Sequence, residues 1–234
     1  MTTNHSFRKF EKFYPILLQI NYLTIFCLIG VLIQPADLLA ESPWQLHQEG
    51  HELTVYTREA EDAVGNEFKA VIIIHQPAEA IGAILMDLKT YSKWIDGCVD
   101  VNFLNKHNNS NNEVYLAINT PWPFYNRDVI FRIKNDAILG EEGMIVQGKA
   151  IEEANVLTRK GYVRVTDAYF HVLLEKMTDS STKVIYQSKI DASFNMPSCL
   201  SRRICANMVY NSMVNLKKLL NDLEISKKKE FALF

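Results

Sequence analysis

The longest uninterrupted pattern in the sequence lies near its end, from Pro197 to Glu224, where no glycine and no further proline occurs. Apolar residues recur there at steps of three and four and form two neighbouring rows on one helical face. One row is Leu200, Ile204 and Met208, and the other is Cys205, Val209, Met213, Leu216, Leu220 and Leu223. The pattern predicts a long amphipathic helix, which must bury its apolar face against another element.

The segments before this helix read mainly as strands, because they alternate or run apolar and are rich in β-branched residues. After the first two strands, Pro77 marks the start of a helix that continues to Leu88. The expected strands are Leu53–Glu59, Glu67–His75, Val99–Leu104, Val114–Asn119, Asp128–Lys134, Gly143–Ala150, Tyr162–Glu175 and Thr182–Ser193. We therefore expect an α+β fold in which the long helix packs on a large antiparallel sheet. A curved sheet would enclose an apolar space under the helix, suited to an apolar ligand.

The N-terminal segment differs in composition from the rest of the chain. Basic residues such as Arg8 and Lys9 precede an uncharged run from Tyr14 to Ile33, and small residues follow near Ala40. This is the layout of a secretory signal cleaved after Ala40. An uncleaved anchor is the alternative, because a helix of this length reaches about 30 Å and can span a bilayer. Either reading predicts export of the remaining chain, which we expect to be periplasmic, secreted or membrane-anchored facing away from the cytoplasm.

We expect residues 1–40 to be the signal or anchor, 41–225 one ligand-binding domain, and 226–234 a basic C-terminal tail. Charge is nearly balanced, with 25 Lys and Arg against 27 Asp and Glu, which argues against a general nucleic-acid binder. The hydrophobic content of 48% excludes a largely disordered chain. The run Lys227–Lys229 is best explained as a solvated tail, and contact with an anionic membrane surface is the alternative.

The sequence contains no familiar catalytic motif. G-x-S-x-G, H-E-x-x-H, C-x-x-C and a phosphate-binding glycine loop are all absent, and the histidines are scattered. Acidic residues that could act as acid or base show no paired spacing: Asp87, Asp96, Asp128, Asp167 and Glu175. Beyond the leader, Cys98, Cys199 and Cys205 are odd in number, so we expect at least one free, buried thiol. The sequence thus predicts a protein without catalysis, metal or cofactor.

From about Trp44 to Leu220 the chain resembles a START domain, the StAR-related lipid-transfer family. The resemblance is sharpest at Pro121-Trp-Pro123 followed by Asn126-Arg-Asp128. Further matching pieces are Val55-Tyr-Thr-Arg58, Glu67-Phe-Lys-Ala-Val71, Tyr91-Ser-Lys-Trp94, Val163-Arg-Val-Thr166, Val184-Ile-Tyr-Gln187 and Met196-Pro197. The resemblance implies a helix-grip fold, with a curved antiparallel sheet around the C-terminal helix and a tunnel for one lipid. It also implies a non-catalytic carrier or sensor gated by this helix and a loop at about Asn135–Gly143. Together with the leader, it suggests a bacterial exported carrier.

The resemblance assigns ligand-binding positions to particular residues. Those expected to face the cavity are Val129, Phe131, Ile133, Phe170, Val172 and Tyr186 on strands, and Ile204, Cys205, Met208, Ser212 and Leu216 on the helix. Sterol-binding members place an arginine six residues after the Arg of Arg-Asp, paired with an acid on the preceding strand. Here Ile133 takes the place of that arginine, and Val114 and Leu116 stand where the acid would be, which predicts a more apolar wall.

Four motif residues are expected to be structural. Arg127 and Asp128 should lie on opposite faces of a strand and each fix local structure. Trp94 and Trp122 are expected to pack in the core.

Two alternatives to a soluble lipid carrier remain open. One is an enzyme on the same scaffold, like the polyketide cyclases, which would need two or more titratable groups converging inside the cavity. The other is a membrane-tethered lipid sensor, which would keep residues 1–40. In each non-enzymatic case the expected partners are one lipid ligand and, transiently, a membrane. We expect no nucleic acid, and a monomer.

Overall fold

The computed structural model describes residues 43–62, 64–108, 111–139, 143–152, 156–191 and 196–231. The strands are β1 Gln45–Glu49, β2 Leu53–Glu59, β3 Asn66–Ile74, β4 Cys98–Asn108, β5 Asn111–Ile118, β6 Asn126–Leu139, β7 Gly143–Ala150, β8 Tyr162–Val165, β9 Ala168–Thr178 and β10 Ser181–Ile190. The helices are α2 Ala78–Met86, the short 3-10 helix η3 Leu88–Thr90, α3 Tyr91–Trp94 and α4 Ser198–Phe231. The predicted leader, residues 1–40, lies outside the described ranges. Among the helices that are described, none is both long and apolar enough to cross a membrane.

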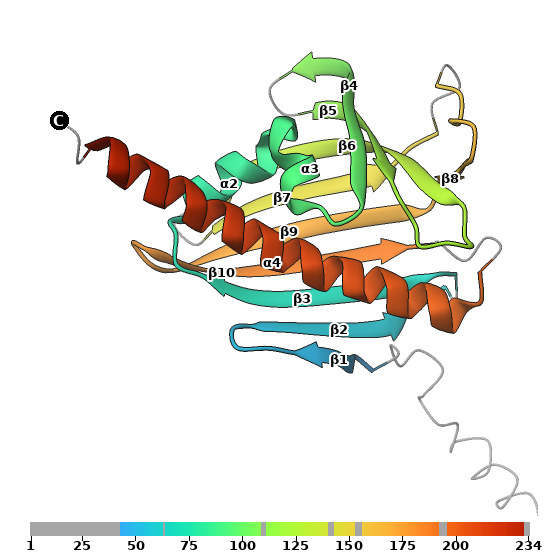
Figure 1. Ribbon diagram of the computed structural model, residues 1–234, viewed down its shortest axis with the longest axis horizontal. Coiled ribbons are helices and arrows are strands. Elements are labelled where there is room, and N and C mark those ends of the chain that lie inside the picture. The colour runs from blue at the N-terminus through green and yellow to red at the C-terminus, as the bar shows by residue number, and fades with distance from the viewer. Residues whose placement is uncertain are drawn as a thin grey trace, which may run out of the picture. The chain divides into compact units, whose positions relative to one another are not determined.

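The strands form one sheet in the order β1-β2-β3-β10-β9-β7-β6-β5-β4, and β8 pairs with β6 beside this path. All neighbouring pairs are antiparallel except β6 and β8. Helix α4 crosses one face of the sheet, with α2 and α3 beside it (Figure 1). This is the antiparallel sheet with a long C-terminal helix that the sequence predicted.

One strand prediction was wrong in its continuity. The stretch predicted as a single strand, Tyr162–Glu175, is divided into β8 and β9. β8 runs parallel to the start of β6, whereas β9 joins β7 and β10. The chain is held at the break, where the Asp167 carboxylate accepts a hydrogen bond from Lys189 Nζ at 2.7 Å and its carbonyl accepts one from Asp191 N at 3.1 Å.

Two other boundaries differ from the prediction. Asn135–Leu139, expected to begin a gate loop, continue β6, and Gly143 already belongs to β7. Residues 140–142 of the predicted loop lie outside the described ranges. Helix α4 continues past Glu224 to Phe231, so most of the segment expected to be a basic tail is helical.

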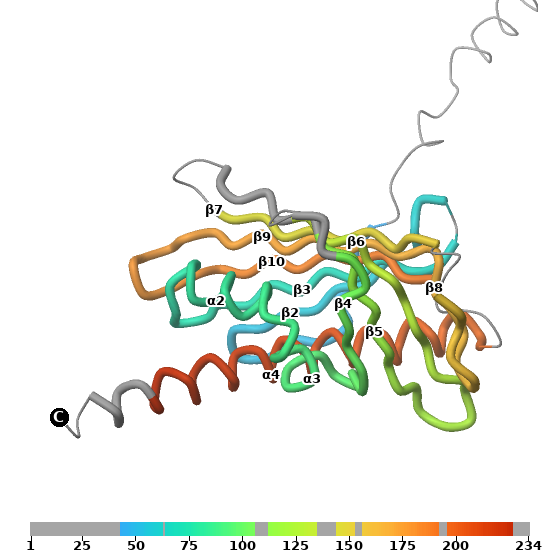
Figure 2. The backbone as a smooth tube through the Cα atoms, turned by 90° about the horizontal axis from the view of Figure 1, so that it is seen from above, coloured from blue at the N-terminus to red at the C-terminus, as the bar shows by residue number. Residues whose placement is uncertain are grey.

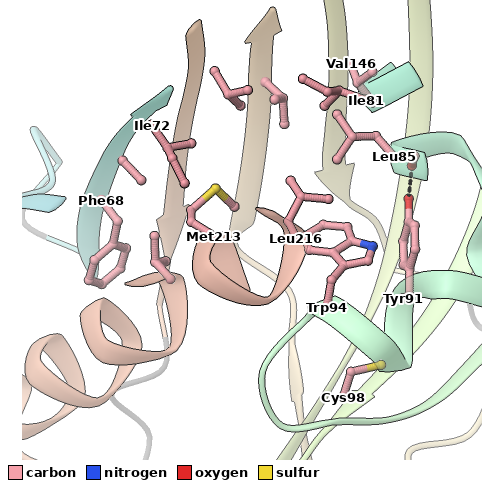
Figure 3. Close-up of a cluster of buried hydrophobic side chains, with 14 of the residues drawn as sticks. Phe68, Ile72, Ile81, Leu85, Tyr91, Trp94, Cys98, Val146, Met213 and Leu216 are labelled. Atoms are coloured by element: carbon pink, nitrogen blue, oxygen red, sulfur yellow. Dashed lines mark hydrogen bonds between the residues drawn. The ribbon is translucent and has the colours of Figure 1, made fainter. Parts of the chain in front are cut away.

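The core lies between the concave face of the sheet and the helices. On the β2–β3 side the sheet packs directly against α4, and Figure 3 shows Ile72 close to Met213. A smaller cluster lies behind the sheet, where Val156 and Tyr162 cover Tyr115, Ala117 and Ile130. The segment that leads into β8 is therefore anchored on the outer face of β5 and β6.

Helices α2 and α3 are joined by a compact turn. Tyr91 Oη donates a hydrogen bond to the Leu85 carbonyl at 2.7 Å, as Figure 3 shows. The indole of Trp94 meets the Tyr91 ring edge-on, with ring centroids 5.4 Å apart. Trp94 Nε1 has no conventional hydrogen-bond partner among the described residues. The edge of the indole that carries this nitrogen faces the Tyr91 ring (Figure 3). We infer that this buried N–H is stabilised by an N–H···π contact with the Tyr91 ring. Trp94 thus packs in the core, as predicted.

Candidate functional site

A cavity of about 190 Å³ lies between α4 and the half of the sheet that curves away from it. Its strand walls come from β5, β6, β7, β8, β9 and β10, and the segment Leu85–Asp96 closes one side. No residue of β1, β2 or β3 lines it, because α4 packs directly on that side of the sheet. The lining is mainly aliphatic and aromatic, which suits an apolar ligand.

The structure brings the predicted site residues together with one exception. Those that line the cavity are Val129, Phe131, Ile133, Phe170, Val172, Tyr186, Ile204, Cys205, Met208 and Ser212. The exception is Leu216, which is fully buried but does not line the cavity. Leu216 lies between Met213 and Trp94, where the space under the helix is already filled (Figure 3). Contact of the ten lining residues with a ligand stays a prediction.

The cavity also has lining residues outside the predicted ligand-binding set, of which Val114 and Leu116 had been expected only as part of a more apolar wall. Val114, Leu116 and Ile118 alternate along β5, and this period of two was visible in the sequence. Tyr91 and Trp94 join the wall because the turn between α2 and α3 places them there. No sequence pattern marks these two, because their position depends on how the short helices pack on the sheet.

Polar groups in the wall gather around Cys205 on α4. Arg127, Tyr186, Ser188 and Ser201 all line the same cavity, and Arg127 and Tyr186 both interact electrostatically with Cys205. Arg127 also donates a hydrogen bond to the Tyr125 carbonyl, which anchors the guanidinium at the cavity wall. Ser188 is 2% exposed, and its side chain interacts with the Tyr186 hydroxyl. One region of an otherwise apolar cavity can therefore receive a polar group.

Burial shifts the pKa of each titratable group in this region in the direction that disfavours its charged form. Desolvation raises the pKa of the Cys205 thiol to about 11, against the opposing effects of Ser201 and Arg127. Burial also raises the pKa of Tyr186. Desolvation lowers the pKa of Arg127, while Cys205 and Asp191 oppose this change. Neither the thiol nor the phenol is tuned for general acid–base catalysis near pH 7.

Cys205 offers a reporter of access to the cavity. Because thiolate is the reactive form, a thiol with a pKa of about 11 should react roughly 100 times more slowly at neutral pH than one at the reference value of 9.0. We expect N-ethylmaleimide to label exposed Cys199 first and Cys205 slowly, with the Cys205 rate rising steeply toward pH 10. Peptide mass spectrometry over time measures both rates in one sample. Equal rates at both thiols would show that Cys205 is not enclosed.

The middle of α4 is fastened to the turn after α3. The backbone N–H of Asp96 donates to Ser212 Oγ at 2.9 Å, and Ser212 Oγ donates to the Met208 carbonyl at 2.7 Å. Asn211 Nδ2 also donates to the Asp96 carboxylate at 2.9 Å. Ser212 therefore has a structural role in addition to lining the cavity.

The opposite edge of α4 is tied to β1–β3 and the turns beside them by several polar contacts. Asn207 pairs with His47, Arg202 with Asn66, Lys217 with Glu52 and Glu224 with Gln76. Glu52 adopts a positive φ of 121°, which is unusual for a residue other than glycine. Its hydrogen bonds with Lys217 and then His75 lower the pKa of its carboxyl group. These contacts hold one edge of α4 against β1–β3, in addition to the hydrogen bonds that hold its middle to Asp96.

Ile133, which takes the place of the arginine of sterol-binding members, has apolar surroundings in the structure. Ile133 lines the cavity, and so do Val114 and Leu116 on the paired strand. The neighbouring Arg132 instead pairs with Glu113 at 2.8 Å, and neither residue lines the cavity. This wall of the cavity therefore offers no ion pair to a ligand.

Arg127 and Asp128 lie on opposite faces of β6, as predicted. Arg127 lines the cavity, whereas Asp128 does not and is completely buried. Arg164 binds both Asp128 carboxylate oxygens, at 2.9 and 3.0 Å, and Tyr115 Oη donates to the same group at 3.2 Å. Asp128 thus holds β8 against β6 and has a structural role.

Trp122 corrects the prediction that this residue packs in the core. Its side chain is 92% exposed at the tip of the loop between β5 and β6. Pro121 and Pro123 on either side direct the chain out of the sheet, so the indole has no core to enter.

A long helix on a curved antiparallel sheet, with an enclosed cavity between them, defines the helix-grip class of ligand-binding proteins. The START domain family matches residues 34–224, and the chain belongs to this family. The uncharacterized protein PA1579 of Pseudomonas aeruginosa is 24% identical over 181 residues, covering 77% of this chain and 88% of that protein.

Solved structures share the same architecture. Human STARD10 superposes with a TM-score of 0.70 at 19% identity, covering 85% of this chain and 81% of its own. The STAR-related lipid transfer protein of Xanthomonas axonopodis has a TM-score of 0.67 at 23% identity, covering 76% and 98%. Human StAR-related lipid transfer protein 5 has a TM-score of 0.68 at 13% identity, covering 90% and 99%. These likenesses show the fold.

Proposed function

We propose that this protein binds one lipid in the cavity under α4 and carries it, without covalent chemistry, outside the cytoplasm. The observation that carries the proposal is the mainly apolar cavity on the α4 side of the sheet. Moving an acyl chain from water into such a space is favourable by about 0.8 kcal/mol for each CH₂ group. The structural relatives named as lipid-transfer proteins support the same ligand class.

The polar region around Cys205 suggests that the ligand is amphipathic. Arg127, Ser188 and Tyr186 could receive a polar headgroup, while Val129, Phe131 and Ile133 would contact the chain. At 190 Å³ the cavity is smaller than the roughly 300–1,000 Å³ of typical small-molecule sites. A lipid with one acyl chain therefore requires less expansion than a lipid with two, and we expect it to bind more tightly.

Absence of covalent chemistry is supported by the upward pKa shifts of Cys205 and Tyr186, which leave them protonated at neutral pH. Among the described residues there is no cluster of three or more metal-ligating side chains. Export is proposed from the predicted leader alone. N-terminal sequencing of the mature protein tests it, since a chain beginning near Glu41 supports a soluble carrier and intact residues 1–40 support the tethered sensor.

Uptake of a fluorescent fatty acid tests the binding proposal. Residues 42–234 form a compact unit, and their described core lies entirely within Leu53–Leu220, so this portion can be studied without the leader. We expect saturable fluorescence enhancement at one probe per chain in detergent-free buffer. Failure to take up this probe or a two-chain fluorescent phospholipid, by protein extracted free of lipid, would contradict the proposal.

A further inference from the structure

Two large apolar side chains stand almost fully in solvent. Trp122 is 92% exposed and Leu157 is 87% exposed, more than the other large hydrophobic residues that the structure describes. Tyr125, in the same loop as Trp122, is 57% exposed. Single exposed hydrophobic residues are common, but a group of them at one place indicates an interaction surface.

The pairing of β6 and β8 places these side chains at one end of the sheet. Asn126 lies opposite Tyr162 in a parallel register, so the segments that precede these two residues leave the sheet at the same end. One segment carries Trp122 and the other carries Leu157. In Figures 1 and 2 the two segments, light green and gold, both lie at the end of the sheet where β8 is labelled.

Basic side chains accompany the apolar ones. Arg159 and Lys160 follow Leu157 and are exposed, whereas residues 119–125 contain no charged side chain. Arg159 approaches Asp100 at 3.5 Å and lies over the Tyr162 ring, but it stays 53% exposed. We call the group Trp122, Tyr125, Leu157, Arg159 and Lys160 the docking tip.

Both segments of the docking tip are held by the rest of the protein. Thr120 N donates to Asn126 Oδ1 at 3.0 Å, and Phe124 N donates to the Pro121 carbonyl at 3.1 Å. In the other segment, Arg164 donates to the Val156 carbonyl at 3.3 Å. The exposed side chains therefore project from ordered backbone, which reduces the entropy lost on binding a surface.

The docking tip is continuous with the cavity. Thr120 lies two residues before Trp122 and lines the cavity, and so does Arg127, whose guanidinium binds the Tyr125 carbonyl. A lipid that leaves or enters beside this loop would pass directly between the cavity and whatever surface the tip contacts.

We propose that the docking tip binds the surface of a lipid bilayer containing anionic headgroups, and this inference rests on the proposed function. Tryptophan and tyrosine favour the headgroup level of a bilayer, because their rings are apolar and their polar atoms stay hydrated. Leu157 adds an apolar contact, and Arg159 and Lys160 attract anionic headgroups. A bilayer fits better than a protein partner because it is also the phase in which an apolar ligand resides. The cavity wall begins beside the tip.

Flotation with vesicles tests the docking tip, using residues 42–234 so that the leader does not bind membrane itself. The vesicles contain phosphatidylcholine, with or without phosphatidylglycerol. We expect the unchanged protein to bind the anionic vesicles more strongly. The variant Trp122→Ala/Leu157→Ala should lower the bound-to-free ratio at least about tenfold on both compositions. Arg159→Gln/Lys160→Gln should remove mainly the preference for phosphatidylglycerol.

A matched control lies at the opposite end of the sheet, in the β9–β10 hairpin (Figure 1). Met177 is 53% exposed and Lys176 is 49% exposed, so Met177→Ala/Lys176→Gln removes the same kinds of groups and should bind normally. Far-UV circular dichroism confirms that each variant is folded. Equal vesicle binding by the Trp122→Ala/Leu157→Ala variant and the unchanged protein would overturn the proposal.

Uptake of the fluorescent fatty acid without vesicles separates this proposal from the proposed function. The tip variants should take up the probe normally but deliver it to acceptor vesicles more slowly. If the unchanged protein takes up the probe yet binds neither vesicle, the docking proposal fails and the binding function stands. If it binds vesicles through the tip but takes up no probe, the binding function fails and the membrane contact stands.

Discussion

Replacing Arg164 with methionine is expected to lower the free energy of unfolding by about 3–5 kcal/mol, the largest stability effect that we predict for one substitution. The substitution removes the bidentate partner of Asp128, a carboxylate with no exposed surface. Tyr115 alone would then remain hydrogen-bonded to this carboxylate. Urea denaturation of residues 42–234, followed by tryptophan fluorescence, measures the change.

Two further variants show whether burial of the charge is the cause. Lys183 pairs with Glu175 at 2.9 Å, but both side chains are more than one third exposed, so Lys183→Met should cost no more than about 1 kcal/mol. Asp128→Leu/Arg164→Met removes both charges and should cost less than Arg164→Met alone. A change below about 1 kcal/mol for Arg164→Met would show that this pair does not hold β8 in place.

Filling the cavity is expected to abolish ligand binding with little loss of stability. Cys205→Trp places an indole among the polar and apolar groups of the wall, and we expect the affinity for the fluorescent fatty acid to fall at least about 100-fold. Because the indole occupies existing space, the cost in stability should stay near the 1–3 kcal/mol typical of overpacking. Fluorescence titration of the probe measures the affinity.

A second filling variant and an outward control make this result interpretable. Ile204→Trp blocks the same cavity from the preceding residue of the helix, so it tests the idea if Cys205→Trp folds poorly. Val214 lies on the same helix but is 43% exposed, so Val214→Trp should bind the probe normally. Unchanged affinity in both filling variants would place the ligand elsewhere.

The sequence predicted the elements whose pattern is local. The spacing of Val209, Met213 and Leu216 identified the buried face of α4, and the alternation in Leu53–Glu59 predicted β2 with its observed bounds. The α4 face could not show where the cavity ends. Leu216 lies one helical turn after Ser212 and was expected on the same face, but its side chain is buried among other side chains and does not reach the cavity. The curvature of the whole sheet decides which turns of α4 have a cavity beneath them.

Tertiary context also decided the cases in which the prediction failed. Trp122 is large and apolar, which favours burial, but the loop between two prolines carries it into solvent. The stretch from Tyr162 to Glu175 has strand-forming residues throughout, and the break appears only in the tertiary pairing, where β8 joins β6 while β9 joins β7 and β10. Local spacing patterns therefore predicted the helix and the strands of the fold. The exposure of Trp122 and the break between β8 and β9 depended on long-range contacts that the spacing does not show.

The central claim is that one lipid occupies the cavity under α4. Native mass spectrometry tests it most directly, on residues 42–234 exposed to a total lipid extract and then freed of unbound lipid. We predict a single adduct of lipid mass at one per chain, absent from Cys205→Trp and retained by Val214→Trp. A spectrum showing only the unbound mass, or an adduct that persists equally in Cys205→Trp, would contradict the claim.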